Sequence, residues 1–540
     1  MAAVAMVSCL VGLASAGHAL HTSWMQLEEL WHAEYKTVEQ IRAISQPVAE
    51  LSDALQRYIV SWEGLVEDSN SGPLHLASED PAAGLSLLRH VAEGWTQVDD
   101  ALFKVKHILH HIEHLASRVD REVLPNAADV AAASEAVARL AHVYGVNATA
   151  LAAGGRLVLQ AVTGHDHHHH HHLLSVNDLT SVGLVAVNKG FLDVGVQFLQ
   201  VAKARAAASQ QARLSSLLAT AVRVHDHVLA LRGPRTLTHA TAPTPHGSPR
   251  EEHGAGAEEA GVVLGVDYLR RHANASWMLE RRPLLERLQV ERLCRGEDLR
   301  APHVTSRLRC RYASGGSSWL SLAPLKVEQA SLDPYIAVVY EVVSRRDAAH
   351  LRDRTRSRLH TQHCPVGDPH AASPVTSWSH ECASVRETEE AAVAGVGRRL
   401  GHLLGVSLDD AASEPYMVVN HGLGGEYGAH RDTHGPSRTP PQPEVGERLA
   451  TVLTHLQAPA QGGRTVFPWV GVGVGGTDGA ALVWWNLLAS HEHDFLIRRA
   501  DCPVVLGHKT VLTKWVGYAA QWKRLPCPAD PSRKVMLPWH

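Results

Sequence analysis

The sequence predicts a multidomain α + β protein, with helical regions first and a sheet-rich domain at the C-terminal end of the chain. Two patterns support this. The N-terminal part repeats apolar residues at three- and four-residue steps, which is typical of amphipathic helices. From Tyr416 onward, short apolar segments alternate with Gly- and Pro-containing turns, which favours an all-β barrel or jelly roll. With 540 residues, 45% of them hydrophobic, the chain can bury large cores and divides into about three or four domains.

Residues 1–16 predict a secretory signal peptide. They are small and apolar and end in Ala14-Ser15-Ala16, an A-x-A-like cleavage site, although no Lys or Arg precedes the apolar run. A buried N-terminal helix is the alternative. No later run is long and apolar enough to span a membrane, and the net charge of -4 argues against a nucleic-acid partner. We therefore expect a soluble lumenal or secreted protein.

Residues 17–130 are expected to form a helical N-terminal domain. Apolar residues recur with a narrow seam from Trp24 to about Trp62, and again from Leu88 to Leu115. Such seams fit core packing within one chain and self-association about equally well.

Residues 131–233 predict a second helical domain. A run of six histidines, 167–172, interrupts it and is expected to be a solvated loop, with loose binding of iron or zinc as the weaker alternative. Beyond it, one or two helical hairpins fit a tetratricopeptide-like unit, with helices over Leu179 to Val187, Leu192 to Ala204 and Leu214 to Leu231. Residues 234–262 shift to Ala, Pro, Gly, His, Ser and Glu and predict a flexible linker.

Candidate chemistry lies in the C-terminal domain, 263–540. His430 and Asp432 follow a strand-like segment, and residues two apart in an extended segment face the same way. They can therefore offer a nitrogen and an oxygen to one ion, as two members of the 2-His-1-carboxylate set that holds Fe(II). On its own this pair is a weak signal, because a solvated turn is the common alternative.

Further motifs follow in one order over about a hundred residues, which is far more specific than any one of them. They are Tyr427-x-x-His430-x-Asp432, Gly463-x-Thr465-x-Phe467-Pro468, Trp485-Asn486-Leu487, Cys502-Pro503-Val504-x-x-Gly507-x-Lys509 and Thr513-Lys514-Trp515. Together they resemble the catalytic domain of collagen prolyl 4-hydroxylase α subunits. The resemblance implies a double-stranded β-helix (jelly-roll) dioxygenase domain over 263–540.

The same resemblance implies an activity and its cofactors. His430 and Asp432 would bind Fe(II), Lys509 would pair with the far carboxylate of 2-oxoglutarate, and Thr451 would add a hydrogen bond to it. The reaction would be hydroxylation of a peptidyl proline in a procollagen-like chain, with O2 consumed and ascorbate rescuing oxidised iron.

One position departs from the family pattern. The third iron ligand would be a His ten residues before Lys509, and Arg499 stands there. A guanidinium stays protonated and has no lone pair to give. We expect Arg499 to turn inward and pair with Asp432, leaving iron binding weak and hydroxylation slight or absent. The alternatives are that His493 substitutes as ligand, with His491 or His508 less well placed, and that the chain is an inactive peptide- or partner-binding subunit.

Six cysteines remain after the predicted signal peptide, and they allow fifteen pairings. The resemblance implies Cys294 with Cys310 and Cys502 with Cys527, which leaves Cys364 to pair with Cys382. Asn147-Ala-Thr149 and Asn274-Ala-Ser276 are N-glycosylation acceptors, usable only in the secretory pathway.

The resemblance also implies partners and a compartment. The N-terminal region would pair two α subunits, a protein disulfide isomerase would serve as β subunit, and the assembly would act in the endoplasmic reticulum lumen. The helical domain over 131–233 would bind a proline-rich or collagen-like peptide in a tyrosine-lined groove. No tyrosine occurs between Tyr144 and Tyr268, so collagen-like substrate binding of the usual kind is not expected.

Overall fold

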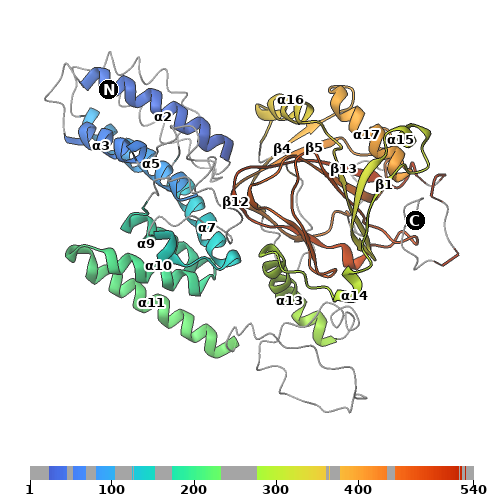
Figure 1. Cartoon of the computed structure of the whole chain (residues 1–540). Coiled ribbons are helices and arrows are strands. Elements are labelled where there is room, and N and C mark those ends of the chain that lie inside the picture. Colours follow the sequence, from blue (N-terminus) through green and yellow to red (C-terminus); the bar gives the residue numbers. More distant parts are fainter. Residues whose placement is uncertain are drawn as a thin grey trace, which may run out of the picture. The chain divides into compact units, whose positions relative to one another are not determined.

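The computed structural model divides the chain into two compact units, 1–224 and 225–540 (Figure 1). The structure describes residues 24–45, 53–67, 81–103, 125, 127–152, 173–232, 276–360, 364, 377–434, 444–521, 523–525 and 529–530. The predicted signal peptide, the histidine run, the linker, Asn274 and Cys527 lie outside these ranges. The predictions made for the signal peptide, the histidine run, the linker and Asn274 stay predictions, as do the predicted domain boundaries.

The first unit is helical over its described residues. Its N-terminal helices are α2 (Trp24–Ser45), α3 (Asp53–Glu67), α5 (Pro81–Phe103), α7 (Ala127–Tyr144) and α8 (Ala148–Ala152). Their apolar seams face one another: the rings of Trp31 and Trp62 lie 4.9 Å apart and join α2 to α3. Buried among them, His90 Nε2 lies 3.2 Å from a Glu34 oxygen. The helical N-terminal region expected from the periodicity is confirmed.

A helical hairpin follows, made of α9 (Val176–Asn188) and α10 (Leu192–Arg205), with α11 (Ala208–Arg232) after it. Glycines let the two hairpin helices approach closely. A Cβ added to Gly195 would lie 2.5 Å from Val187 Cγ2 and 2.9 Å from the Gly183 carbonyl oxygen. Ser175 starts α9 through a capping box with Asp178, which satisfies backbone N–H groups that the first turn leaves unpaired.

The second unit is built on an antiparallel sheet of eleven strands in the order β1-β2-β3-β10-β6-β13-β5-β11-β8-β9, with β4 paired to β5. A two-stranded sheet joins β12 and β7. The strands are β1 (Cys310–Ala313), β2 (Leu325–Leu332), β3 (Tyr335–Tyr340), β4 (Ser377–Val385), β5 (Tyr416–His430), β6 (Arg448–Gln457), β7 (Gln461–Gly462), β8 (Thr465–Phe467), β9 (Val472–Val474), β10 (Ala481–Trp485), β11 (Arg499–Asp501), β12 (Val504–Leu506) and β13 (Lys509–Gly517). The expected β-rich C-terminal domain is confirmed.

Helices flank this sheet. In Figure 1, α16 (Arg345–Arg356) and α17 (Ala391–Leu404) lie on one side of the strands, and α13 (Ser276–Cys294) lies on the other. Two short helices, α14 (Pro302–Thr305) and α15 (Ser318–Leu322), complete the unit. The sheet interior is apolar at one end, where the rings of Phe467 and Trp484 meet edge to face 5.4 Å apart.

The disulfides correct two of the three expected pairings. Cys294 is bonded to Cys502, with their Cα atoms 5.6 Å apart, so the expected Cys294–Cys310 and Cys502–Cys527 bridges are wrong. The reason is packing: α13 contacts β8 and β9, which brings its last residue beside the segment after β11. Cys310 instead opens β1 at the far edge of the sheet, where it is exposed and free. The Cys364–Cys382 bridge is confirmed.

Among the described helices, none combines the length and the apolar character that crossing a bilayer requires.

Candidate functional site

The central strand β5 carries the site, because it pairs with β4, β11 and β13 at once. The register of β11 on β5 sets Arg499 directly opposite His430. Lys509 begins β13 and lies opposite His421 of β5. Residues from distant parts of the sequence therefore meet in one buried interior.

One ring nitrogen of His430 makes a hydrogen bond, and the other has no hydrogen-bond partner among the described residues. Nδ1 lies 2.7 Å from the Gly428 carbonyl oxygen, which can only accept, so Nδ1 carries the proton. Nε2 then bears the lone pair. It lies 3.3 Å from Asp432 Oδ1, yet no described residue completes a hydrogen bond to it. Burial lowers the pKa of His430, and the nearby Arg499 charge adds to that shift, so the ring stays neutral.

Asp432 follows β5 and is buried. Thr451 donates its hydroxyl to Asp432 Oδ2 over 2.7 Å, and Asn486 Nδ2 in turn donates to the Thr451 oxygen over 2.9 Å. The structure thus joins Thr451 to Asp432, and its expected contact with 2-oxoglutarate stays a prediction. Burial raises the pKa of Asp432, but the Arg499 charge, together with the Thr451 hydrogen bond, overrides this and holds the pKa well below its usual value.

The Arg499 side chain turns inward and pairs with Asp432, as the sequence led us to expect. Its Nη2 lies 3.0 Å from Asp432 Oδ1, and its Nε lies 3.2 Å from Oδ1 and 3.3 Å from Oδ2. The guanidinium carbon also lies 5.2 Å from the centre of the Trp484 ring, within range of a cation–π contact. The Arg499 charge is therefore held between a carboxylate and an aromatic face.

His493 is not brought to this pair. It lies in the loop before β11, where it forms an isolated bridge with Leu487. Over the described part of the chain, the only set of three potential ligand groups within 4.8 Å of one another is Cys364, His380 and Cys382, and two of these are joined by a disulfide. His493 therefore does not complete a ligand set with His430 and Asp432.

Sequence reasoning missed Asp501. This residue accepts from Arg499 Nη1 and from Lys509 Nζ, each over 2.6 Å, and from the Thr465 hydroxyl over 2.7 Å. Burial raises the pKa of Asp501, but the Lys509 and Arg499 charges hold it well below its usual value. A signal was available: on a strand, Asp501 shares a face with Arg499 two residues earlier, and so it points into the same interior.

These residues do not fit an Fe(II) ion in the arrangement described. The His430 lone pair and the Asp432 carboxylate are suitable ligands, but both oxygens of Asp432 already face the Arg499 guanidinium. The third position offers a permanent cation in place of a lone pair. The site supplies two ligands and one charge that repels a metal.

Comparison with known proteins finds relatives of this chain among prolyl 4-hydroxylase α subunits. Residues 23–156 match the family described as "Prolyl 4-Hydroxylase alpha-subunit, N-terminal region". Prolyl 4-hydroxylase subunit alpha-1 of Rattus norvegicus is 34% identical over 250 residues, which are 45% of this chain and 46% of the relative. The chain thus spans about half the length of the alpha-1 relatives in that match. Prolyl 4-hydroxylase subunit alpha-3 of Homo sapiens is 28% identical over 522 residues, 90% of this chain and 92% of the relative.

Among solved structures, a viral collagen prolyl hydroxylase from Paramecium Bursaria Chlorella virus-1 is similar to 34% of this chain and 94% of its own, with 18% identity and a TM-score of 0.28.

The sequence matches show that this chain is similar to prolyl 4-hydroxylase α subunits, over 90% of its length in the case of subunit alpha-3. The match to the N-terminal region described for these subunits falls on the first helices of the chain.

Proposed function

We propose that this protein is an α-subunit-like member of the family that binds a peptide or a partner chain and hydroxylates proline slightly or not at all. The observation that carries the proposal is the buried ion pair between Arg499 and Asp432. It fills the position at which the family pattern calls for the third metal ligand.

The electrostatics of the pair explain why iron would bind weakly. A metal ion would need the Asp432 carboxylate, and binding it would leave Arg499 paired with Asp501 alone. The buried guanidinium would lose half of its ion pairing and would face the metal, a second cation, so binding would carry an electrostatic cost. That cost would come directly out of the free energy of metal binding.

A working hydroxylase is the second candidate, favoured by the family and by one observation: the unbonded lone pair of the buried His430 Nε2 points toward Asp432. In that case Fe(II) at His430 and Asp432, 2-oxoglutarate at Lys509, O2 and ascorbate would support hydroxylation of peptidyl proline. Arg499 would first have to leave Asp432.

The remaining parts of the proposal concern fold detail, partners and location. We infer a double-stranded β-helix for the C-terminal sheet and a tetratricopeptide-like hairpin over α9 and α10, supported by the antiparallel order and by the close packing at Gly195. A second α subunit and a protein disulfide isomerase β subunit in the endoplasmic reticulum lumen would be the partners. The exposed side chain of Asn147 is compatible with glycosylation there.

The α9–α10 hairpin would bind other peptides than a tyrosine-lined groove does. Phe198 is fully buried in the first unit, and the Phe191 ring stacks on His142 at 4.6 Å. Both aromatic side chains of the hairpin are therefore committed to packing. A proline-rich ligand would find little aromatic surface here.

An equilibrium titration with Fe(II) and 2-oxoglutarate under anaerobic conditions tests the proposal. The natural chain should bind Fe(II) weakly, and Arg499→His should gain tight binding, because the variant restores an imidazole opposite His430. Tight binding in the natural chain that His493→Ala abolishes would favour the hydroxylase with a substitute ligand instead.

A further inference from the structure

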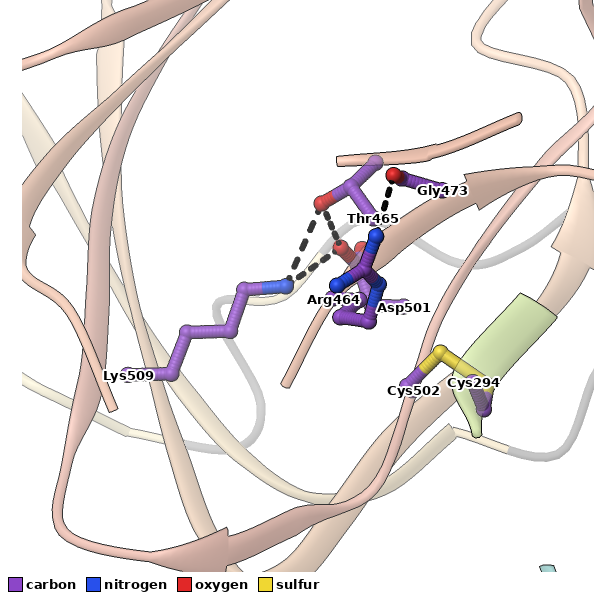
Figure 2. The surroundings of a disulfide bond; sticks show 7 residues. All are labelled: Cys294, Arg464, Thr465, Gly473, Asp501, Cys502 and Lys509. Atoms are coloured by element: carbon purple, nitrogen blue, oxygen red, sulfur yellow. Dashed lines mark hydrogen bonds and ion pairs between the residues drawn. A yellow bond between two sulfur atoms is a disulfide. The ribbon is translucent and has the colours of Figure 1, made fainter. Parts of the chain in front are cut away.

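We infer that Asp501 is a built-in carboxylate ligand of Lys509, and that it takes the place of a free dicarboxylate in the barrel interior. The inference rests on the proposed function and extends it from the metal position to the co-substrate position. Figure 2 shows the contact: the Lys509 ammonium points at Asp501 and Thr465, beside the Cys294–Cys502 disulfide.

The register of the strands places hydrogen-bond donors around the Asp501 carboxylate. β11 pairs with β8 so that Asp501 lies opposite Thr465. The Thr465 hydroxyl donates to Asp501 over 2.7 Å, and Lys509 Nζ lies 3.3 Å from the same hydroxyl oxygen. With Arg499 Nη1 on its other oxygen, Asp501 is met by three donors, two of them charged. A carboxylate so surrounded is bound as a ligand would be.

The four charged groups form one linear chain of three ion pairs. Asp432 pairs with Arg499, Arg499 pairs with Asp501, and Asp501 pairs with Lys509. All four are buried, and Lys509 is fully inaccessible. Two carboxylates balance two permanent or near-permanent cations, so the interior is neutral without any metal or anion. No further charge is needed to compensate it.

This balance predicts what an external dicarboxylate would meet. Its far carboxylate would have to displace Asp501 from Lys509, and the displaced Asp501 would stay close by, because β11 holds it there. Restoring a histidine at Arg499 therefore leaves Lys509 occupied. Removing the Asp501 carboxylate instead leaves two cations and one anion, a site with an uncompensated positive charge that an added carboxylate can fill.

Chemical rescue of Asp501→Ala tests this inference. The melting temperature of the natural chain, of Asp501→Ala and of the double variant Asp501→Ala/Lys509→Met is followed against 2-oxoglutarate and against acetate, with no metal added. Asp501→Ala should melt lower than the natural chain, and its melting temperature should rise with the logarithm of the anion concentration. The natural chain and the double variant should show no rise.

The matched control is Glu414→Gln, which removes a half-buried carboxylate that pairs with an arginine, Arg448, outside the chain of charges. It should lose stability without gaining rescue by anions. If Asp501→Ala does not fold, Asp501→Asn keeps the shape of the side chain and is measured in the same way.

An equal rise in the natural chain, or no rise in either Asp501 variant, would overturn the inference. The outcome is separable from that of the proposed function: tight Fe(II) binding by the natural chain would refute the latter, whereas the anion series needs no metal and reports on Asp501 alone.

Discussion

The α9–α10 hairpin and the strands around Lys509 are held together in opposite ways. The hairpin relies on apolar side chains and on two glycines, Gly183 and Gly195, that let the helices touch. The strands β5, β11 and β13 enclose four charged groups that neutralise one another. Apolar packing tolerates a change of pH or of one charge, whereas a chain of buried ion pairs is left with an uncompensated charge when any one member is lost. The two regions should therefore respond to different perturbations.

The largest effect is expected from breaking the chain of charges. Arg499→Ala leaves Asp432 and Asp501 without their shared cation, and should lower the free energy of unfolding of the second unit by about 3–5 kcal/mol. Denaturant unfolding followed by tryptophan fluorescence measures it. Arg354→Ala is the control: Arg354 is 63% exposed in its pair with Glu390, so solvent screens the pair and its loss should change the stability far less. Equal losses in the two variants would contradict the account.

The second largest effect is expected from lowering the pH, which should destabilise the second unit. Burial lowers the pKa of His455 to about 4, and burial likewise lowers the pKa of His380 to about 4. Both start from an unfolded value of about 6.5, so the unfolded chain takes up the protons first as the pH falls. Their contribution to stability is fully present above about pH 6.5 and is lost as the pH falls toward 4, on the order of 3 kcal/mol for each group.

Unfolding measured from pH 7.5 down to about 4.5 checks this window. The second unit should weaken over it, and His455→Gln should flatten the dependence. A stability that stays constant across the window in the natural chain would show that these rings do not remain neutral in the folded state.

The third largest effect is expected from disturbing the close packing of the α9–α10 hairpin. Gly195→Ala would place a Cβ 2.5 Å from Val187 Cγ2 and 2.9 Å from the Gly183 carbonyl oxygen, and should destabilise the first unit by about 1–3 kcal/mol. The control is Gly64→Ala in α3, where no atom lies within 4 Å of the added Cβ. That change should be neutral or stabilising by up to about 1 kcal/mol, because alanine favours helix. Thermal unfolding by circular dichroism separates the two.

The smallest effect concerns the start of α9. Ser175→Ala removes the hydroxyl that accepts from the Asp178 backbone N–H, and should cost about 1 kcal/mol. Ser317 precedes α15 but makes no capping hydrogen bond, so Ser317→Ala should change the stability little. Matching losses at both serines would mean that the cap contributes nothing specific.

Much of the site could be predicted because strand periodicity is local. Alternation on a strand put His430 and Asp432 on one side. The family resemblance, not the spacing itself, put Arg499 at the position of the third ligand. Asp501 was missed because the expected ligands drew attention to single positions, although the same alternation puts it beside Arg499. Contacts between residues far apart in the sequence could not be predicted. Cys294 meets Cys502 only because α13 packs against β8 and β9, and no spacing in the sequence encodes that contact.

The central claim is that the buried site between β5, β11 and β13 is electrically neutral without a metal or a co-substrate. The melting temperature of the natural second unit, within the full chain, tests it most directly when measured in a chelator and then in Fe(II) with 2-oxoglutarate under anaerobic conditions. The account predicts the same melting temperature in both, since Arg499 and Asp501 already satisfy Asp432 and Lys509. A rise with Fe(II) and 2-oxoglutarate that saturates as a single site would contradict it.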